Sequence, residues 1–372
     1  MTTQGHTHTV PPCKYVTDVG HLTRLPGRQR HQATEVAARY GFRANDYYLG
    51  LIDWSDPADP IRRLIVPHPG ELTDWGLLDA SNEAANRVVP GVQHKYRDTV
   101  LLLCSQVCGG LCRYCFRKRL FLDGNDETAV NVDQALDYIA EHPEVTNVLL
   151  TGGDPLMLST RRLTAIIERL RKIEHVRIIR IGSKMPAFWP WRILDDPALL
   201  ELLSTHSTAR SRIYLMMHFD HPRELTEPAV EAVDRLIRAG VICVNQCPIV
   251  RGVNDDTDVL TELFRELSFV GCPQYYLFQG RPTAGNQPYE VPLVRSYELM
   301  EAAKRRCSGL AKRARLIMSH ASGKVEVVGL DEQNIYLRYH RARAAADRGR
   351  FFIRRRNDSA YWLDDLEAID AA

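Results

Sequence analysis

Apolar runs of strand length recur from residue 99 onward and alternate with segments of helical periodicity. The runs are continuous rather than alternating in polarity, which is typical of strands buried on both faces of a parallel sheet. We expect strands at residues 99–103, 145–150, 176–181, 212–217, 241–246 and 275–279. Helix-period segments lie between them at residues 132–140, 160–173, 198–204, 228–239 and 259–269. The alternation predicts an α/β fold in which helices flank a parallel sheet, and six such units are enough for a barrel or a partial barrel.

The segments on either side of this pattern give weaker signals. Residues 1–93 predict a helical, loop-rich region, with a helix near 33–40 and Asp-Pro pairs that break helices further on. After a helix at 296–306, two short apolar runs precede an arginine-rich tail, which we interpret as solvated surface or a subunit contact. We therefore divide the chain into an N-terminal region (1–93), a barrel (94–294) and a C-terminal extension (295–372).

Composition excludes several classes of protein. The chain has 372 residues, 45% hydrophobic and 25% charged, and its 48 Lys and Arg nearly balance 46 Asp and Glu. That balance argues against non-specific nucleic-acid binding over the whole surface. No apolar run approaches the roughly 18 residues that span a bilayer, and the polar residues 1–8 contain no signal-peptide core. We expect a cytoplasmic protein with no membrane or nucleic-acid partner, whose nine cysteines form no disulfide framework.

Three cysteines lie together directly after the first predicted strand. Cys108, Cys112 and Cys115 form a C-x3-C-x2-C pattern, and no fourth cysteine follows at a matching interval. Three thiolates can hold three irons of a [4Fe–4S] cluster, which leaves one iron open to chelate a small molecule. The alternative is a structural zinc site, which would need a further ligand to complete a tetrahedron. Cys104 is the nearest extra thiol, but it falls inside the predicted strand, where core packing is its expected role.

This cysteine pattern, with Tyr114 before the last cysteine, resembles the radical S-adenosylmethionine (SAM) superfamily. The resemblance implies a partial (β/α)6 TIM-like barrel, in agreement with the six units above. It also implies that the open iron binds SAM and that the reduced cluster cleaves SAM to a 5'-deoxyadenosyl radical. Gly152, Gly153 and Asp154, after the second strand, resemble the superfamily's methionine-binding element. Alone, a Gly-Gly-Asp sequence is more often only a tight turn, so its weight comes from its pairing with the cysteine loop.

Six ordered motifs between residues 94 and 324 narrow the resemblance to the lysine 2,3-aminomutase family. They are CRYCFRKR (112–119), LLTGGD (149–154), RIGSKMP (180–186), HFDHP (218–222), NQCPIVRGVND (245–255) and QYYLFQ (274–279). The family implies SAM contacts at Ser183, His218 and Gln246, which all lie at or just past predicted strand ends. Each of the three, taken alone, is better explained as a polar residue that closes a strand, but together they support a SAM site.

The same family uses pyridoxal 5'-phosphate (PLP) as a second cofactor. The resemblance implies that Lys324, which follows Gly323 in the C-terminal extension, is the lysine to which PLP bonds. A solvent-facing turn lysine is the alternative. Lys95 and Arg97, just before the first strand, correspond to the family's basic stretch and are expected to hold the phosphate. Ordinary surface positions are the alternative for both.

The substrate contacts depart from the lysine-specific pattern. Arg117 matches the family's arginine that binds the substrate α-carboxylate, and a bidentate guanidinium suits that anion. Lysine-specific members hold the distal ammonium with two aspartates, whereas Arg281 stands at one of these positions here and the other falls near Met318. A buried ammonium without a counter-charge is costly, so we expect glutamate or another non-lysine substrate. The alternatives for Arg281 are a surface position or an ion pair with Asp or Glu.

The sequence therefore predicts an isomerase, a SAM- and PLP-dependent amino acid 2,3-aminomutase with a small amino-acid substrate. By family analogy we expect a flavodoxin- or ferredoxin-type reductant and a homo-oligomer, most simply a dimer. Two alternatives stay open: a radical SAM enzyme of the same branch with other hydrogen-abstraction chemistry or acting on a protein-bound lysine, as in the elongation factor P branch, and a non-enzymatic iron–sulfur electron carrier.

Overall fold

Neighbouring parallel strands form the centre of the fold, which the computed structural model describes for residues 12–129 and 131–369. They are β5 (Thr99–Ser105), β6 (Asn147–Gly152), β7 (Ile178–Ser183), β8 (Arg212–Met217), β9 (Ile242–Pro248), β10 (Gln274–Phe278) and β11 (Arg315–His320). Most of their apolar side chains are buried, as expected for strands covered on both faces, although Ile242 and Tyr275 are exposed. The α/β fold with a partial TIM-like barrel is confirmed, and a seventh parallel strand comes from the C-terminal extension.

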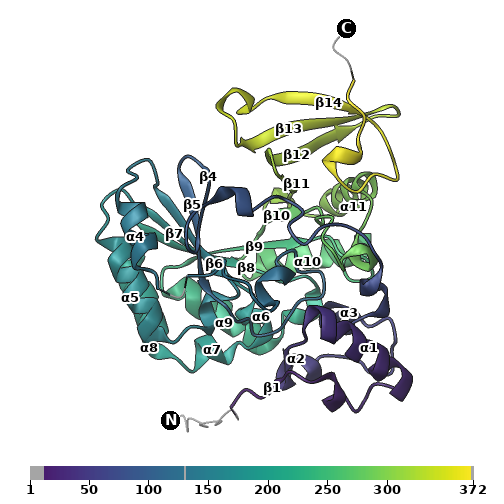
Figure 1. The fold of residues 1–372 in the computed structure, drawn as a ribbon, viewed down its shortest axis with the longest axis horizontal. Helices are drawn as coiled ribbons and strands as arrows, with labels where there is room; N and C mark the ends of the chain where they lie inside the picture. The colour runs from purple at the N-terminus through teal and green to yellow at the C-terminus, as the bar shows by residue number, and fades with distance from the viewer. Residues whose placement is uncertain (1–11, 130, 370–372) are drawn as a thin grey trace.

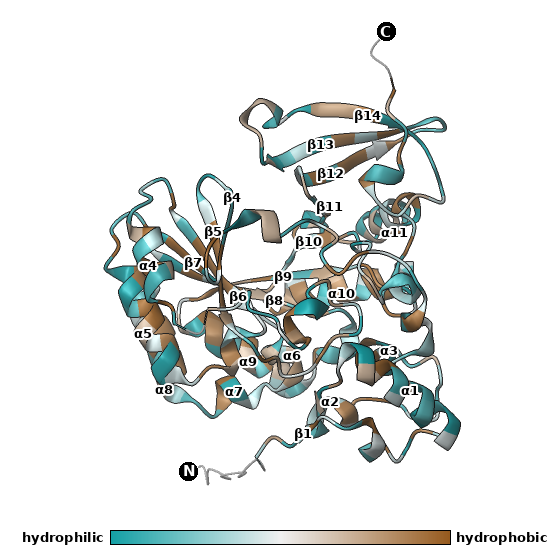
Figure 2. Cartoon of the chain, in the orientation of Figure 1, coloured by the Kyte–Doolittle hydropathy of each residue, from teal (hydrophilic) through white to brown (hydrophobic). Residues whose placement is uncertain are grey.

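Amphipathic helices cover the outer face of this sheet (Figure 1). They are α4 (Asp133–Ala140), α5 (Thr160–Arg171), α8 (Pro197–His206), α9 (Glu227–Arg238), α10 (Thr257–Phe269) and α11 (Leu293–Arg305). Figure 2 shows strongly apolar strands beside helices whose surface mixes apolar and polar positions. Polar caps start several helices; for example, the Ser159 side chain accepts a hydrogen bond from the Arg162 amide. Two short helices after β7, α6 (Met185–Phe188) and α7 (Trp191–Leu194), were not predicted.

The N-terminal region is helical only in its first part. It contains α1 (Gly27–Tyr40), α2 (Asp46–Gly50) and α3 (Pro60–Ile65), with a small antiparallel sheet of β1 (Tyr15–Val16) and β2 (Ala44–Asn45). Its last part supplies β3 (Arg87–Val89) and β4 (Val92–Tyr96), which extend the main sheet antiparallel to β5. The boundaries suggested by the sequence, 93/94 and 294/295, fall within β4 and α11, so no linker separates the three segments.

The C-terminal extension continues the main sheet instead of forming a separate surface. β12 (Gly323–Leu330), β13 (Asn334–Ala342) and β14 (Phe351–Arg355) follow β11 as antiparallel strands, so the sheet has twelve strands in the order β14 to β3. Lys324 lies on β12 rather than in an exposed turn. The interpretation of the basic tail as solvated surface is wrong for Arg341, which lies on β13 and faces Lys324 across the ladder.

The structure bears on the expectations about membrane spans and disulfides. No helix among the described residues is long and apolar enough to cross a membrane. Residues 1–8, on which the absence of a signal peptide rested, lie outside the described part of the chain. All nine cysteines are free.

Candidate active site

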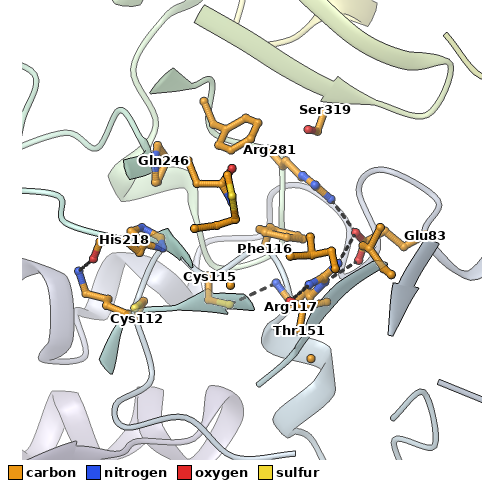
Figure 3. A pocket seen from close by; sticks show the side chains of 18 of the residues that line it. Glu83, Cys112, Cys115, Phe116, Arg117, Thr151, His218, Gln246, Arg281 and Ser319 are labelled. Atoms are coloured by element: carbon orange, nitrogen blue, oxygen red, sulfur yellow. Dashed lines mark hydrogen bonds and ion pairs between the residues drawn. The ribbon is translucent and has the colours of Figure 1, made fainter. Parts of the chain in front are cut away.

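A cavity lies at the carboxyl ends of the parallel strands, and all three segments of the chain contribute to its wall (Figure 3). Nearly every side chain that the sequence singled out lines it, and Arg97 is the exception. The lining residues predicted from the sequence are Lys95, Cys108, Cys112, Cys115, Arg117, Gly152, Gly153, Asp154, Ser183, His218, Gln246, Arg281 and Lys324. The fold therefore brings together motifs that are as far apart as β4 and β12.

The three cysteines of the loop after β5 are free and partly exposed to this cavity. Cys104 is buried, and its Sγ lies 3.7 Å from the Thr151 carbonyl oxygen, as expected for a thiol that packs in the core. Within the described residues, no three His, Cys, Asp or Glu side chains are grouped as ligands of a single metal ion. In a [4Fe–4S] cluster each thiolate binds its own iron. The donor set of Cys108, Cys112 and Cys115 fits such a cluster, with no fourth thiolate in the cavity wall.

Gly152 and Gly153 are required by the close approach of β6 to the cysteine loop. Gly152 has φ +118°, a conformation that side chains disfavour, and a Cβ there would lie 2.5 Å from the Ser105 carbonyl oxygen. A Cβ on Gly153 would lie 2.5 Å from the Val107 carbonyl oxygen. The two glycines thus let the strand end pack directly against the loop that carries the cysteines.

Asp154 fastens the loops that follow β6 and β7. Its carboxylate accepts hydrogen bonds from the Ser183 hydroxyl at 2.9 Å, the Lys184 amide at 2.8 Å and the Leu156 amide at 2.9 Å. Burial raises the pKa of Asp154 to about 6. Ser183, predicted to contact SAM, lines the cavity while its hydroxyl is held by Asp154.

His218 belongs to a buried network beside the cysteine loop. Its Nε2 lies 3.1 Å from both the Tyr114 hydroxyl and Oδ1 of Asp220. The Lys184 ammonium donates to Asp220 and Glu224 at 2.6 Å each. Burial disfavours the Lys184 ammonium, but these two carboxylates outweigh it and raise its pKa. The network fixes the His218 ring next to the residues that would hold the cluster.

Lys324 is half-buried, and its Nζ lies over two aromatic rings, 4.4 Å from the centre of Tyr276 and 4.8 Å from that of Phe278. Burial holds the pKa of Lys324 well below its ordinary value, and the charges of Arg180, Arg281, Arg341 and Lys95 lower it further. A lowered pKa favours the neutral amine, which is the state that attacks an aldehyde.

The cations around Lys324 are poorly balanced by carboxylates. Arg180 donates from Nε to the Asn147 side-chain oxygen at 2.8 Å, and the Lys95 ammonium donates to the His320 carbonyl oxygen. Arg341 donates to the Thr99 hydroxyl at 3.2 Å and pairs with Asp98 at the rim. Arg97, which the sequence suggested for the phosphate, is not part of this group. Its carbonyl oxygen lies 3.1 Å from a ring nitrogen of His94, and its side chain does not line the cavity. Lys95, Arg180 and Arg341 form a cradle suited to a phosphate.

The substrate arginines predicted from the sequence meet at a residue that the sequence did not suggest, Glu83 of the N-terminal region (Figure 3). Arg117 donates to it from Nε at 3.1 Å and from Nη2 at 3.2 Å. Arg281 donates from Nη1 at 3.3 Å. The stated alternative, that Arg281 pairs with an acidic residue, is thus what the structure shows. Nothing in the local sequence around Glu83 has a motif that could have marked it.

Met318 stands near the position of the second aspartate of lysine-specific members. Met318 is fully buried on β11 and does not line the cavity, whereas its neighbour Ser319 does. Among the described lining residues, seven are lysines or arginines and two, Glu83 and Asp154, are carboxylates. Both carboxylates are already saturated, Glu83 by arginines and Asp154 by hydrogen-bond donors. The cavity can therefore accept several further negative charges but offers none to an ammonium group.

Comparison with known proteins adds independent information. Residues 102–264 match the model of the radical SAM superfamily. A protein of Aquifex aeolicus (strain VF5) named "Putative L-lysine 2,3-aminomutase" is 50% identical over 359 residues, which cover 96% of each chain.

Two further relatives carry different substrates in their names. The L-lysine 2,3-aminomutase of Clostridium subterminale is 38% identical over 266 residues, covering 71% of this chain and 62% of that protein. The glutamate 2,3-aminomutase of Clostridioides difficile (strain 630) is 31% identical over 302 residues, covering 80% of this chain and 70% of that protein.

Proposed function

Because the chain belongs to the 2,3-aminomutase family of radical SAM enzymes, we propose that it moves the α-amino group of an acidic amino acid, most simply glutamate, to Cβ. The family makes the protein an isomerase. The observation that carries the finer proposal is the composition of one cavity wall, where three thiols, a lysine with a lowered pKa and an excess of cations converge.

The two ends of this cavity would perform separate tasks. Cys108, Cys112 and Cys115 would hold the iron–sulfur cluster, and Gly152–Asp154, Ser183, His218 and Gln246 line the adjoining wall, where SAM would lie. A reactive radical formed there would need water to be excluded from this wall once the cofactors are bound. The Tyr114–His218–Asp220 hydrogen bonds keep the imidazole in one orientation.

At the other end, Lys324 would hold PLP, with Lys95, Arg180 and Arg341 around the phosphate. When bound, PLP supplies a conjugated π-system that delocalises the radical while the nitrogen passes between two carbons. The chain itself lowers the pKa of the Lys324 amine and places its Nζ over the rings of Tyr276 and Phe278.

The acidic substrate is proposed from the charges. A lysine side chain would bring an ammonium into a wall with no free carboxylate, and such a buried charge is costly. A dicarboxylic amino acid instead meets Arg117 and Arg281, and a guanidinium has five N–H donors, more than Glu83 alone occupies.

Anaerobic turnover with a panel of amino acids tests the proposal. The reconstituted protein, with SAM, PLP and dithionite, is expected to convert glutamate to β-glutamate and to leave lysine unchanged, with products identified by mass spectrometry. Conversion of lysine alone would contradict the acidic substrate. Formation of 5'-deoxyadenosine without any β-amino product from the panel would favour another hydrogen-abstraction reaction, including one on a protein-bound lysine.

The Lys324→Ala variant tests the PLP site without turnover. The wild-type protein is expected to show an aldimine absorbance band beside the iron–sulfur bands, and the variant to lose only the former. Lys312→Ala, at an exposed position, is the matched control and should keep both. The flavodoxin- or ferredoxin-type reductant, the dimer and the cytoplasmic location stay predictions by family analogy.

A further inference from the structure

Glu83 lies between the two arginines to which the proposed function assigns the substrate carboxylates. Its Oε1 accepts hydrogen bonds from Nη2 of Arg117 at 3.2 Å and from Nη1 of Arg281 at 3.3 Å. These two nitrogens are therefore no more than two hydrogen-bond lengths apart. Figure 3 shows both guanidinium groups directed at the Glu83 carboxylate.

Each partner in this arrangement is held in place from another side. Arg117 also donates from Nη1 to the Thr151 hydroxyl at 2.9 Å. The Arg281 guanidinium carbon lies 3.6 Å from the centre of the Phe116 ring, and that of Arg117 lies 4.9 Å from the same centre. Phe116 thus contacts both arginines through its ring, whereas Glu83 accepts hydrogen bonds from both.

The segment that carries Glu83 is itself anchored. The Glu83 amide donates to the Asp79 side chain at 2.8 Å, and the Ser81 hydroxyl donates to the Ser319 carbonyl oxygen at 2.8 Å. Glu83 is nearly buried, and the surrounding arginines outweigh the effect of burial and hold its pKa far below the usual range. The bridge is therefore a permanent anion in a rigid wall, at all pH values at which the enzyme would work.

We propose that Glu83 is a specificity-determining residue that sets the separation of Arg117 and Arg281 and so selects the chain length of the acidic substrate. The inference rests on the proposed function, because it takes these arginines as the carboxylate sites. Aspartate and glutamate carry carboxylates joined by two and three carbons, a span of roughly 4–5 Å when extended. The span of dicarboxylates with four or five carbons matches the spacing of two arginine nitrogens that donate to the same oxygen atom of Glu83, and the span of longer dicarboxylates does not.

Removal of the bridging anion leaves two guanidinium groups that repel each other at short range. Glu83→Gln keeps the size of the side chain but loses the charge-assisted bonds that link the pair. Glu127→Gln is a matched control, since Glu127 pairs with Arg119, which Glu83 also contacts, but does not line the cavity.

Calorimetry tests the inference. It measures how unbranched dicarboxylates, from malonate to pimelate, bind to the protein loaded with cluster, PLP and SAM. Wild type and Glu127→Gln are expected to favour succinate and glutarate over pimelate by at least about tenfold. In Glu83→Gln we expect this preference to shrink to about threefold or less, and Glu83→Asp to restore part of it.

The outcomes separate the inference from the proposal beneath it. A Glu83→Gln protein that binds PLP normally and keeps the wild-type preference would overturn the role of Glu83, as would a wild type without any length preference. A wild type that binds PLP but no dicarboxylate at all would overturn the acidic substrate itself. Equal loss of length preference in Glu127→Gln would show that the whole ion cluster, rather than the bridge, sets the spacing, and would also overturn the inference.

Discussion

Lys324 on β12 and Arg341 on β13 are direct partners in an antiparallel ladder, so their side chains leave the sheet next to each other and enter the same cavity. The Arg341 guanidinium carbon also lies 4.3 Å from the centre of the Tyr96 ring. The lysine proposed to hold PLP thus has a cation on the neighbouring strand.

Substitution of this cation should affect the phosphate and spare the aldehyde. We expect Arg341→Gln to raise the Kd for PLP by about tenfold or more, because a charge-assisted bond to phosphate is lost. The Kd for pyridoxal, which has no phosphate, should stay within about twofold. Spectroscopic titration of both ligands measures the difference.

The control for this titration is Arg348→Gln, an exposed position in the same basic tail. Parallel weakening of PLP and pyridoxal in Arg341→Gln would point to a general loss of structure and would contradict a phosphate contact.

The reactivity of the Lys324 amine should depend on its cationic neighbours. Their positive charges disfavour the ammonium and lower the pKa of Lys324, so removal of one charge raises that pKa. In Arg180→Gln we expect the pH at which pyridoxal is trapped at half-maximal rate by cyanoborohydride to rise by about one unit. Pyridoxal is used because it does not sense the phosphate cradle.

Arg177→Gln, at an exposed position just before β7, should leave this pH profile unchanged. A profile in Arg180→Gln that coincides with wild type would mean that the charge of Arg180 does not lower the pKa of Lys324.

A carboxylate from the N-terminal region, Glu71, anchors the cysteine loop. The fully buried Glu71 accepts hydrogen bonds from Arg113 at 2.8 Å and from the Tyr289 hydroxyl at 2.9 Å, and it pairs with Lys118 at 3.3 Å. We expect Glu71→Gln to lower the free energy of unfolding by about 3 kcal/mol at pH 7, since it leaves buried cations without a counter-ion. Anaerobic urea unfolding measures this loss.

The pH dependence of that loss has a definite sign. Burial alone would raise the pKa of Glu71, but Arg113 and Lys118 outweigh it and hold the pKa below its ordinary value of 4.5. The stabilisation is therefore complete above that value and is lost as the pH falls through the lower pKa of the folded state. The difference between wild type and Glu71→Gln should shrink in acid; a constant difference would rule out the charge as its source.

Cluster content should depend on the loop cysteines and not on the buried ones. We expect Cys112→Ala to lose most iron and sulfide after anaerobic reconstitution, because each loop thiolate would bind one iron. Cys104→Ala, which removes a buried thiol next to the Thr151 carbonyl, should retain the wild-type content. The opposite result, with iron lost only in Cys104→Ala, would remove the proposed cluster site.

The parallel strands were predictable because continuous apolar runs mark them, and β8 lies at the predicted residues. Motifs right after such strands also predicted where most of the site lies, since parallel strands end at one edge. β13 and β14 were missed because Arg338, Arg341 and Arg354 break up their apolar pattern. Alternation of polar and apolar positions in these strands reflects a sheet that is exposed on one face.

Glu83 and Arg341 were out of reach of local patterns. Each is an ordinary charged residue in its own segment, and its role depends on a neighbour that is far away in the chain, Arg281 for one and Lys324 for the other. Arg97 shows the reverse case, since a position beside Lys95 on the chain does not bring its side chain into the cavity.

The unbroken ladder from β4 to β13 has a consequence for how the two halves of the reaction are coordinated. The cysteine loop follows β5 and Lys324 lies on β12, so backbone hydrogen bonds across the sheet set the spacing of the two proposed cofactor sites. A hinge between separate domains would let that spacing vary from one turnover to the next. Here the sheet keeps the spacing constant. Insertions and deletions will therefore be tolerated in the helical connections and not within the strands.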